Sequence, residues 1–194
     1  MFRLLEHFDF EGEKIKGSRF IVNLFPIDKI EEAKPILHCV RKKHATANHH
    51  CHALKTINGE VRSSDDGEPR GSAGLPILRR VEAKDAAGLV VVVTRYFGGV
   101  KLGVGGLVRA YGSAAAMAME KAKFARIIDK IEISVTCSYS DSGHLLSLLR
   151  NVEDASIEYG MMVSATVRLP LSEVDSFAKE LKDRTSGRVG LDFT

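Results

Sequence analysis

The segment with the clearest chemical potential is a glycine-rich stretch, residues 95–106, between a valine-rich run and a long helical pattern. Glycine permits positive φ angles and lets a ligand approach the backbone closely. The start of the following helix supplies unpaired N–H groups and a partial positive charge, which suit an anion. The sequence therefore predicts a phosphate or nucleic-acid site formed by the cations and glycines of this region: Arg95, Gly98, Gly99, Lys101, Gly103, Gly105, Gly106 and Arg109.

Two familiar phosphate-binding patterns do not fit this stretch. No Gly-Lys-Ser/Thr follows the glycines, as a Walker loop requires, and residues 103–106 lack the third glycine of a dinucleotide-binding fingerprint. The same glycines could instead form a tight turn that solves a packing problem. Both interpretations stay open on the sequence alone.

Three carboxylates lie within four positions of a second segment: Asp65, Asp66 and Glu68. Carboxylates this close together can hold Mg²⁺ or share a proton. These three are therefore the candidate catalytic residues of a metal-assisted hydrolase or transferase. Clustered acids in a loop of glycine and proline are more often turn formers and helix caps, and this is the favoured interpretation.

The third segment is His49-His50-Cys51-His52, whose side chains alternate between the two faces of a predicted strand. His50 and His52 share one face and, with Asp66, are weak candidates for a zinc site. His49 and His50 are also placed at the rim of the phosphate site. A nucleophilic Cys51 beside histidine is the reactive alternative. Buried, satisfied side chains are the favoured interpretation, and the sequence predicts no metal and no cofactor.

The elements that must position these segments form an irregular first domain. Val90 to Val93 are β-branched without alternation, which predicts a central strand covered on both faces. Pro35 either kinks the first helix or lies in the first turn of a helix that starts late. The predicted elements are strands at 18–25, 51–57 and 89–93 and helices at 28–43, 76–83 and 107–124.

Residues 130–194 have a regular pattern of strand, helix, strand, strand, helix and strand. The first helix is predicted to start at an Asp141-Ser142 cap and the second at a capping box of Ser172 and Asp175. Cys137 lies on the apolar side of the first strand. This order predicts a ferredoxin-like βαββαβ domain with no catalytic cluster of its own. The fold class is α+β, with two α/β-sandwich domains at 1–126 and 130–194.

Composition excludes several classes of protein. Hydrophobic residues make up 44% of the 194 residues and charged residues 27%, which excludes wholesale disorder. No apolar run approaches the ~20 residues of a membrane span. The three cysteines form no CxxC pair, which argues against a disulfide framework. We expect a soluble, cytoplasmic protein with no membrane partner.

Charge divides unevenly between the two predicted domains. Residues 130–194 hold seven basic and ten acidic side chains, against 28 and 25 in the whole chain. Residues 1–129 therefore keep 21 basic and 15 acidic side chains, a net charge of +6. This balance hints at an anionic partner for the first domain, although ordinary scatter of surface charge explains it about as well.

Three segments in this order and spacing resemble the YigZ/Impact family, in its bacterial two-domain form: residues 48–53, 64–74 and 93–111. The resemblance implies a first domain with the β/α fold of the second domain of a small-subunit ribosomal protein. It implies a second domain similar to the ferredoxin-like domains of elongation factor G. Eukaryotic relatives regulate translation under amino-acid starvation, and the motif residues of the family have no agreed roles.

Three functional hypotheses follow. The leading one is a non-enzymatic protein that binds RNA, the ribosome or another phosphate-bearing ligand and is linked to regulation of translation. The first alternative is the metal-assisted hydrolase or transferase that uses the acidic segment. The second is a protein-binding regulator of translation factors.

Overall fold

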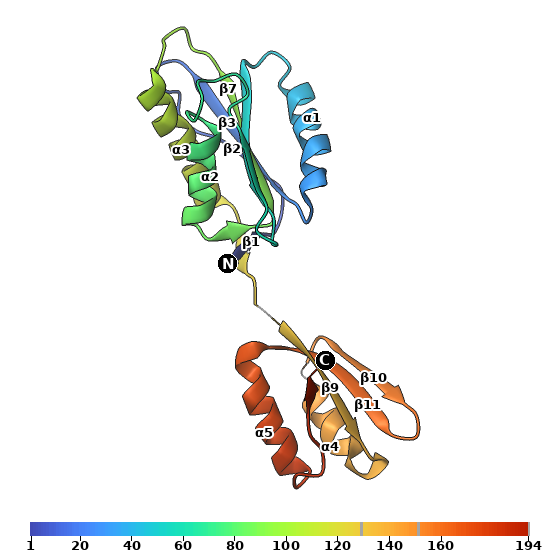
Figure 1. Ribbon diagram of the computed structural model, residues 1–194. Helices are drawn as coiled ribbons and strands as arrows, with labels where there is room; N and C mark the ends of the chain where they lie inside the picture. Colours follow the sequence, from blue (N-terminus) through green and yellow to red (C-terminus); the bar gives the residue numbers. More distant parts are fainter. Residues whose placement is uncertain (129, 151, 194) are drawn as a thin grey trace. The chain divides into compact units, whose positions relative to one another are not determined.

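The computed structural model describes residues 1–128, 130–150 and 152–193. The chain forms two compact units, Met1–Ile127 and Ile128–Thr194 (Figure 1). Both combine helices with mainly antiparallel sheets, so the predicted α+β class is confirmed. Within the described ranges, no helix is long and apolar enough to cross a membrane.

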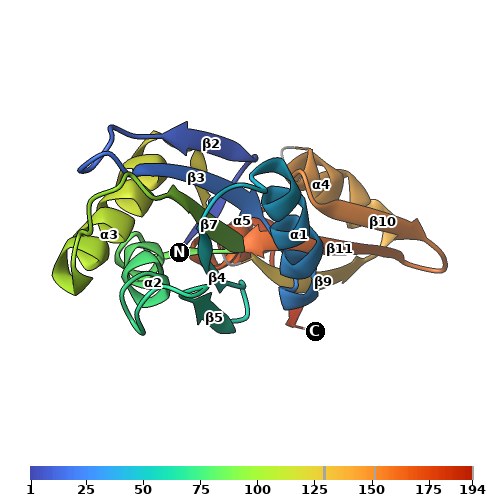
Figure 2. The same cartoon turned by 90° about the horizontal axis from the view of Figure 1, so that it is seen from above.

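A five-stranded antiparallel sheet forms the centre of the first unit. In spatial order its strands are β2 (Phe8–Glu11), β3 (Arg19–Pro26), β7 (Leu89–Tyr96), β4 (His49–Lys55) and β5 (Val61–Ser64). Helices α2 (Gly74–Ala83) and α3 (Val104–Lys121) cover one face, and α1 (Ala33–Lys43) lies on the other (Figures 1 and 2).

The central position predicted for the valine-rich strand is confirmed. Val93 of β7 pairs with Val22 of β3 on one side and with Cys51 of β4 on the other. Val91 and Val93 pack in the core under α2 and α3, whereas Val90 and Val92 pack in the smaller core under α1. A strand buried on both faces has no need of polar alternation, which explains its continuous apolar run.

The first helix starts late, as one of the two alternatives for Pro35 predicts. A short 3₁₀ turn, Ile30–Glu32, precedes α1, and Pro35 lies in the first turn of that helix. A proline there breaks no helical hydrogen bond, because the first N–H groups of a helix have no internal acceptor.

Two helices begin earlier than the sequence pattern predicts. Helix α2 starts at Gly74 rather than Pro76, because the Asp65 carboxylate accepts hydrogen bonds from the Ala73 and Gly74 N–H groups. Helix α3 starts at Val104 rather than Leu107 and ends at Lys121. Gly105 and Gly106 thus belong to its first turn and not to the preceding loop.

A small second sheet in the first unit was not predicted. It joins β1 (Phe2–Leu4) to β6 (Ala86–Ala87) in parallel and to β8 (Phe124–Arg126) in antiparallel. Pairing with β1 explains why the chain leaves the helical conformation before Phe124.

The second unit has the predicted βαββαβ order. Its elements are β9 (Lys130–Cys137), α4 (Tyr139–Leu149), β10 (Ala155–Tyr159), β11 (Val163–Pro170), a 3₁₀ turn (Leu171–Glu173), α5 (Val174–Arg184) and β12 (Asp192–Phe193). The strand order is β10-β11-β9-β12, which is the arrangement of ferredoxin-like domains. Cys137 is buried in the core of this unit, as predicted.

Both predicted helix caps in the second unit are wrong. Helix α4 is preceded by Ser138 as its N-cap, and Asp141 lies in the first turn, where it pairs with Arg188 at 2.6 Å. Helix α5 follows a 3₁₀ turn, and its N-cap Glu173 forms no side-chain cap. At α4 the Asp141 side chain pairs with the distant Arg188, and at α5 the helix continues from a 3₁₀ turn, neither of which the local sequence reveals.

Candidate functional site

The first half of the glycine-rich segment is fixed by its neighbours. The Phe97 N–H donates to Oδ1 of Asn48 at 2.8 Å, and the Gly98 N–H donates to Oγ of Ser18 at 3.2 Å. Gly98 also lies directly against the backbone of Gly17. The approach is so close that a Cβ on Gly98 would be 1.9 Å from the Gly17 carbonyl carbon. Here the turn-forming interpretation of the glycines describes the contacts well.

The second half of the segment is open. Gly99 and Gly103 have φ angles of +86° and +70°, and a Cβ on either would meet nothing within 4 Å. Gly103 is the N-cap of α3 and offers no side-chain acceptor to the first turn. The N–H groups of that turn therefore keep the partial positive charge of a helix N-terminus.

A cavity of about 350 Å³ adjoins this helix start. Lys101 lies at its edge as an exposed cation that forms no ion pair within the described ranges. Phe97, which is 45% exposed, adds an aromatic ring to the wall. Arg109 is exposed on α3 and does not line the cavity. The remaining lining residues are Glu68, Pro69, Arg95, Leu102, Gly103, Val104 and Leu107.

Arg95 lies in the same wall, but its charge is already neutralised. The side chain is buried and its Nη1 donates to Oε1 of Glu68 at 2.6 Å. The Tyr111 hydroxyl donates to the same Glu68 oxygen at 2.7 Å. A buried charge is stable in a protein when it is paired in this way. Arg95 and Glu68 therefore form a neutral part of the cavity wall.

Asp65 organises the backbone that leads into α2. Its carboxylate accepts hydrogen bonds from the N–H groups of Gly71, Ala73 and Gly74 at 2.7, 2.9 and 2.8 Å. Burial acts to raise the pKa of Asp65, but these three donors outweigh it and hold the pKa below its ordinary value. The geometry of Asp65 is that of a helix cap.

Asp66 connects the acidic segment to two other elements. It has a positive φ of 43°, and its carboxylate accepts the His50 N–H at 2.6 Å and pairs with Arg41 at 2.5 Å. Burial acts to raise its pKa, but the hydrogen bonds from His50 and Arg41 lower it overall. Asp65, Asp66 and Glu68, which lie within four positions of the sequence, thus have three different sets of partners.

The histidines divide between two regions. Nδ1 of His49 contacts the Asp66 carbonyl oxygen at 2.9 Å, and Nε2 of His50 contacts the His44 carbonyl oxygen at 3.2 Å. His52 lines a different cavity under α1. Burial lowers the pKa of both His50 and His52, which favours their neutral forms. Nowhere in the described ranges do three or more His, Cys, Asp or Glu side chains form a group that could hold a metal ion.

Cys51 is buried on the opposite face of β4. Burial raises the pKa of its thiol to about 12, and the Sγ–H donates to the Asp65 carbonyl oxygen at 3.0 Å. The nucleophile in cysteine chemistry is the thiolate, and this environment disfavours it. Cys51 therefore has the chemistry of a core residue.

Sequence reasoning missed two features of this region. One is Phe97 as an exposed ring beside the glycines, which its position between Tyr96 and Gly98 could have suggested. The other is a second cavity of about 690 Å³ under α1, for which the sequence offers no local pattern. Its walls come from α1, β4 and β5, and only the folded sheet brings them together.

Comparisons with known proteins agree with this architecture. Residues 16–119 match the Impact N-terminal domain, and residues 135–188 match a domain of unknown function, DUF1949. IMPACT family member YigZ of Escherichia coli is 35% identical over 92% of this chain and 91% of its own length. An IMPACT family member of Thermus thermophilus is 40% identical over 90% of this chain and 97% of its own.

A solved structure supports the fold over the whole length. The crystal structure of a hypothetical protein is 32% identical, with a TM-score of 0.66, and covers 100% of this chain and 96% of the other. Together with the two matched domains, these similarities extend through both units. The chain belongs to the Impact family.

Proposed function

We propose that this chain binds RNA, in a role linked to the regulation of translation, and that the start of α3 contacts the RNA backbone. Family membership supports the link to translation through the role of its eukaryotic relatives. The net charge of +6 on residues 1–129 supports an anionic partner.

The observation that carries the proposal is the cavity of about 350 Å³ at the helix start. It combines the exposed ring of Phe97, the exposed cation of Lys101 and a helix N-terminus without a side-chain cap. Single-stranded nucleic acid is bound by such combinations, with aromatic rings stacking on bases and cations or amides contacting phosphates.

In this arrangement the two arginines of the segment have different roles. Arg95 is paired with Glu68 and holds the wall of the cavity. Arg109 is exposed on α3 and adds to the positive field around the site. Lys101 is the side chain available for direct phosphate contact, with the backbone N–H groups at the start of α3.

Fluorescence anisotropy with a labelled single-stranded RNA tests the proposal at about 50 and about 200 mM salt. Lys101→Ala should weaken binding and reduce the slope of log K against log salt by about 1. Phe97→Ala should cost about 1–3 kcal/mol of binding free energy through lost stacking and leave the slope unchanged. Lys42→Ala, which removes the same charge from α1, is the matched control.

Two results would contradict the proposal. One is an absence of RNA binding at the lower salt concentration. The other is binding that Lys101→Ala and Phe97→Ala weaken no more than Lys42→Ala does. If RNA does not bind and purified translation factors do, the protein-binding alternative would replace this proposal.

The hydrolase or transferase alternative has less support. Asp65 caps α2, Asp66 pairs with Arg41, and Glu68 pairs with Arg95, so each carboxylate already has a partner. A phosphatase and peptidase screen of the purified protein, with metal analysis, tests that alternative directly.

A further inference from the structure

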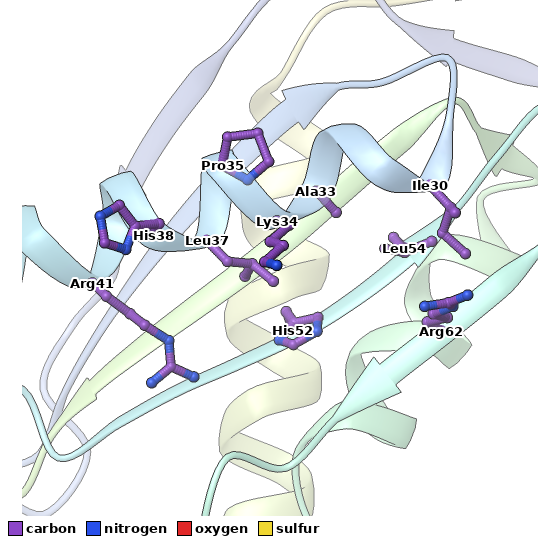
Figure 3. Close-up of a pocket in the computed structure, with 10 residues that line it drawn as sticks. All are labelled: Ile30, Ala33, Lys34, Pro35, Leu37, His38, Arg41, His52, Leu54 and Arg62. Carbon is purple, nitrogen blue, oxygen red and sulfur yellow. The ribbon is translucent and has the colours of Figure 1, made fainter.

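The cavity under α1 lies on the face of the sheet opposite to α3. It has a volume of about 690 Å³ and opens between α1 and the strands β4 and β5 (Figure 3). This size is within the range of about 300–1,000 Å³ found for small-molecule sites. Its apolar walls are formed by Ile30, Ala33, Pro35, Leu37 and Leu54.

The polar side chains around this cavity carry one sign of charge. Lys34, Arg41 and Arg62 line it, and the lining residues in the described ranges include no Asp or Glu. Arg41 is paired with Asp66. Lys34 and Arg62 are exposed, and neither forms an ion pair with any residue that the structure describes. Figure 3 shows these cations from α1 and β5 around the same opening.

Of the two histidines in the wall, His52 adds little to this charge balance. Burial lowers the pKa of His52, so its ring is mainly neutral near pH 7 and lies beside Leu54 as part of the floor. His38 is exposed on α1. The permanent charges at the opening are therefore those of the lysine and the two arginines.

We propose that this cavity binds a small amphipathic anion, which has an apolar body and a carboxylate or phosphate head group. The apolar body would replace water against Leu37 and Leu54, which is the main source of affinity for an apolar wall. The head group would lie by Lys34 and Arg62, because these cations have no carboxylate partner. A neutral or cationic amphiphile of the same length would lack the attraction between the head group and these two cations.

Titrations of the full chain followed by ¹H–¹⁵N NMR test the proposal with four probes of one chain length. The probes are octanoate, octyl phosphate, 1-octanol and octylammonium. Only an anion can accept charge-assisted hydrogen bonds from these cations, so at least one of the two anions should bind about tenfold more tightly than the alcohol and the cation. Comparison of octanoate with octyl phosphate identifies the preferred head group.

Two variants link the binding to this cavity. Arg62→Glu should weaken the anion about tenfold, whereas Arg79→Glu, an equal change of charge on α2, should leave affinity unchanged. Leu37→Trp should fill the cavity and abolish binding of the anion. Arg62 and Arg79 are both exposed, so neither charge reversal removes a buried contact.

The proposal is overturned if the alcohol or the cation binds as tightly as both anions. It is also overturned if the shifted resonances map away from α1, β4 and β5, or if Arg62→Glu and Arg79→Glu have equal effects. RNA binding at the start of α3 is measured in a separate experiment. Failure of the amphiphile titration would therefore leave the RNA proposal unaffected, and failure of RNA binding would leave this proposal unaffected.

Discussion

The guanidinium of Arg95 lies 2.6 Å from the carboxylate of Glu68, although 27 positions separate the two residues in the chain. The pair joins the end of β7 to the segment before α2, and the Tyr111 hydroxyl adds α3 to the same oxygen of Glu68. Three parts of the first unit therefore meet at one buried carboxylate.

Arg95→Ala should destabilise the first unit by about 3–5 kcal/mol, because it leaves the Glu68 carboxylate buried without its cation. Hydrogen exchange at the amides of β7 reports the stability of this unit specifically. Lys101→Ala, an exposed cation six positions away, is the control and should change exchange very little.

The double variant Glu68→Ala with Arg95→Ala completes the cycle. The double variant should be destabilised by clearly less than the sum of the two single effects. Each single variant leaves one buried charge without its partner, whereas the double variant leaves none. Strictly additive effects would contradict the coupling between the two side chains.

Asp65 and Asp66 should make the first unit sensitive to acid. The folded-state pKa of each lies below the ordinary value of 3.8, so ionisation of these groups stabilises the folded state. That stabilisation is fully present well above pH 3.8 and is lost as the pH falls through the lowered pKa. Hydrogen exchange at α2, corrected for intrinsic rates, should show a decrease in stability over this range.

Asp65→Asn provides the matched comparison. It should reduce stability near pH 7 by about 1 kcal/mol through the weaker cap and should flatten the loss of stability in acid. An acid dependence identical to that of the parent chain would show that Asp65 does not titrate with folding.

Gly98→Ala should be far more damaging than Gly99→Ala. A Cβ on Gly98 would overlap the backbone of Gly17, whereas a Cβ on Gly99 meets nothing within 4 Å. Gly99→Ala should cost about 1–2 kcal/mol for its positive φ, and Gly98→Ala should cost clearly more. Urea unfolding monitored by circular dichroism compares the two, and equal midpoints would contradict the contact.

The three cysteines should differ sharply in reactivity. Cys39 is exposed on α1, whereas Cys51 and Cys137 are buried and burial raises the pKa of both. A thiol reagent at pH 8 should modify one cysteine quickly in the folded protein and all three in urea. Rapid modification of Cys51 in the folded chain would contradict its buried position.

The elements that the sequence predicts best are those with an unambiguous pattern. The valine-rich run predicts β7, and alternation predicts β9 and β11 with the whole βαββαβ order. Strands β1, β6 and β8 have only two or three residues each, too few for any periodicity to appear. At the start of α4 the partner of Asp141 is Arg188, 47 positions away, and α5 continues from a 3₁₀ turn.

The candidate site is harder to predict, because residues that are close in the sequence can have side chains that point in different directions. The sequence alone places Arg95 and Lys101 together as cations of one segment. Arg95 is in phase with Val91 and Val93, which face the core under α3, and this phase indicates an inward side chain. Its partner Glu68 could not be identified from the sequence, since nothing local connects the two segments.

The contact between Gly17 and Gly98 separates a packed part of the segment before α3 from an open part. The part up to Gly98 is clamped against the turn before β3, while the part from Gly99 to Gly103 has open space around both glycines. If RNA binds at the start of α3 as proposed, the backbone is expected to adjust between Gly99 and Gly103 and not at the packed Gly98, so few backbone torsions would have to be ordered.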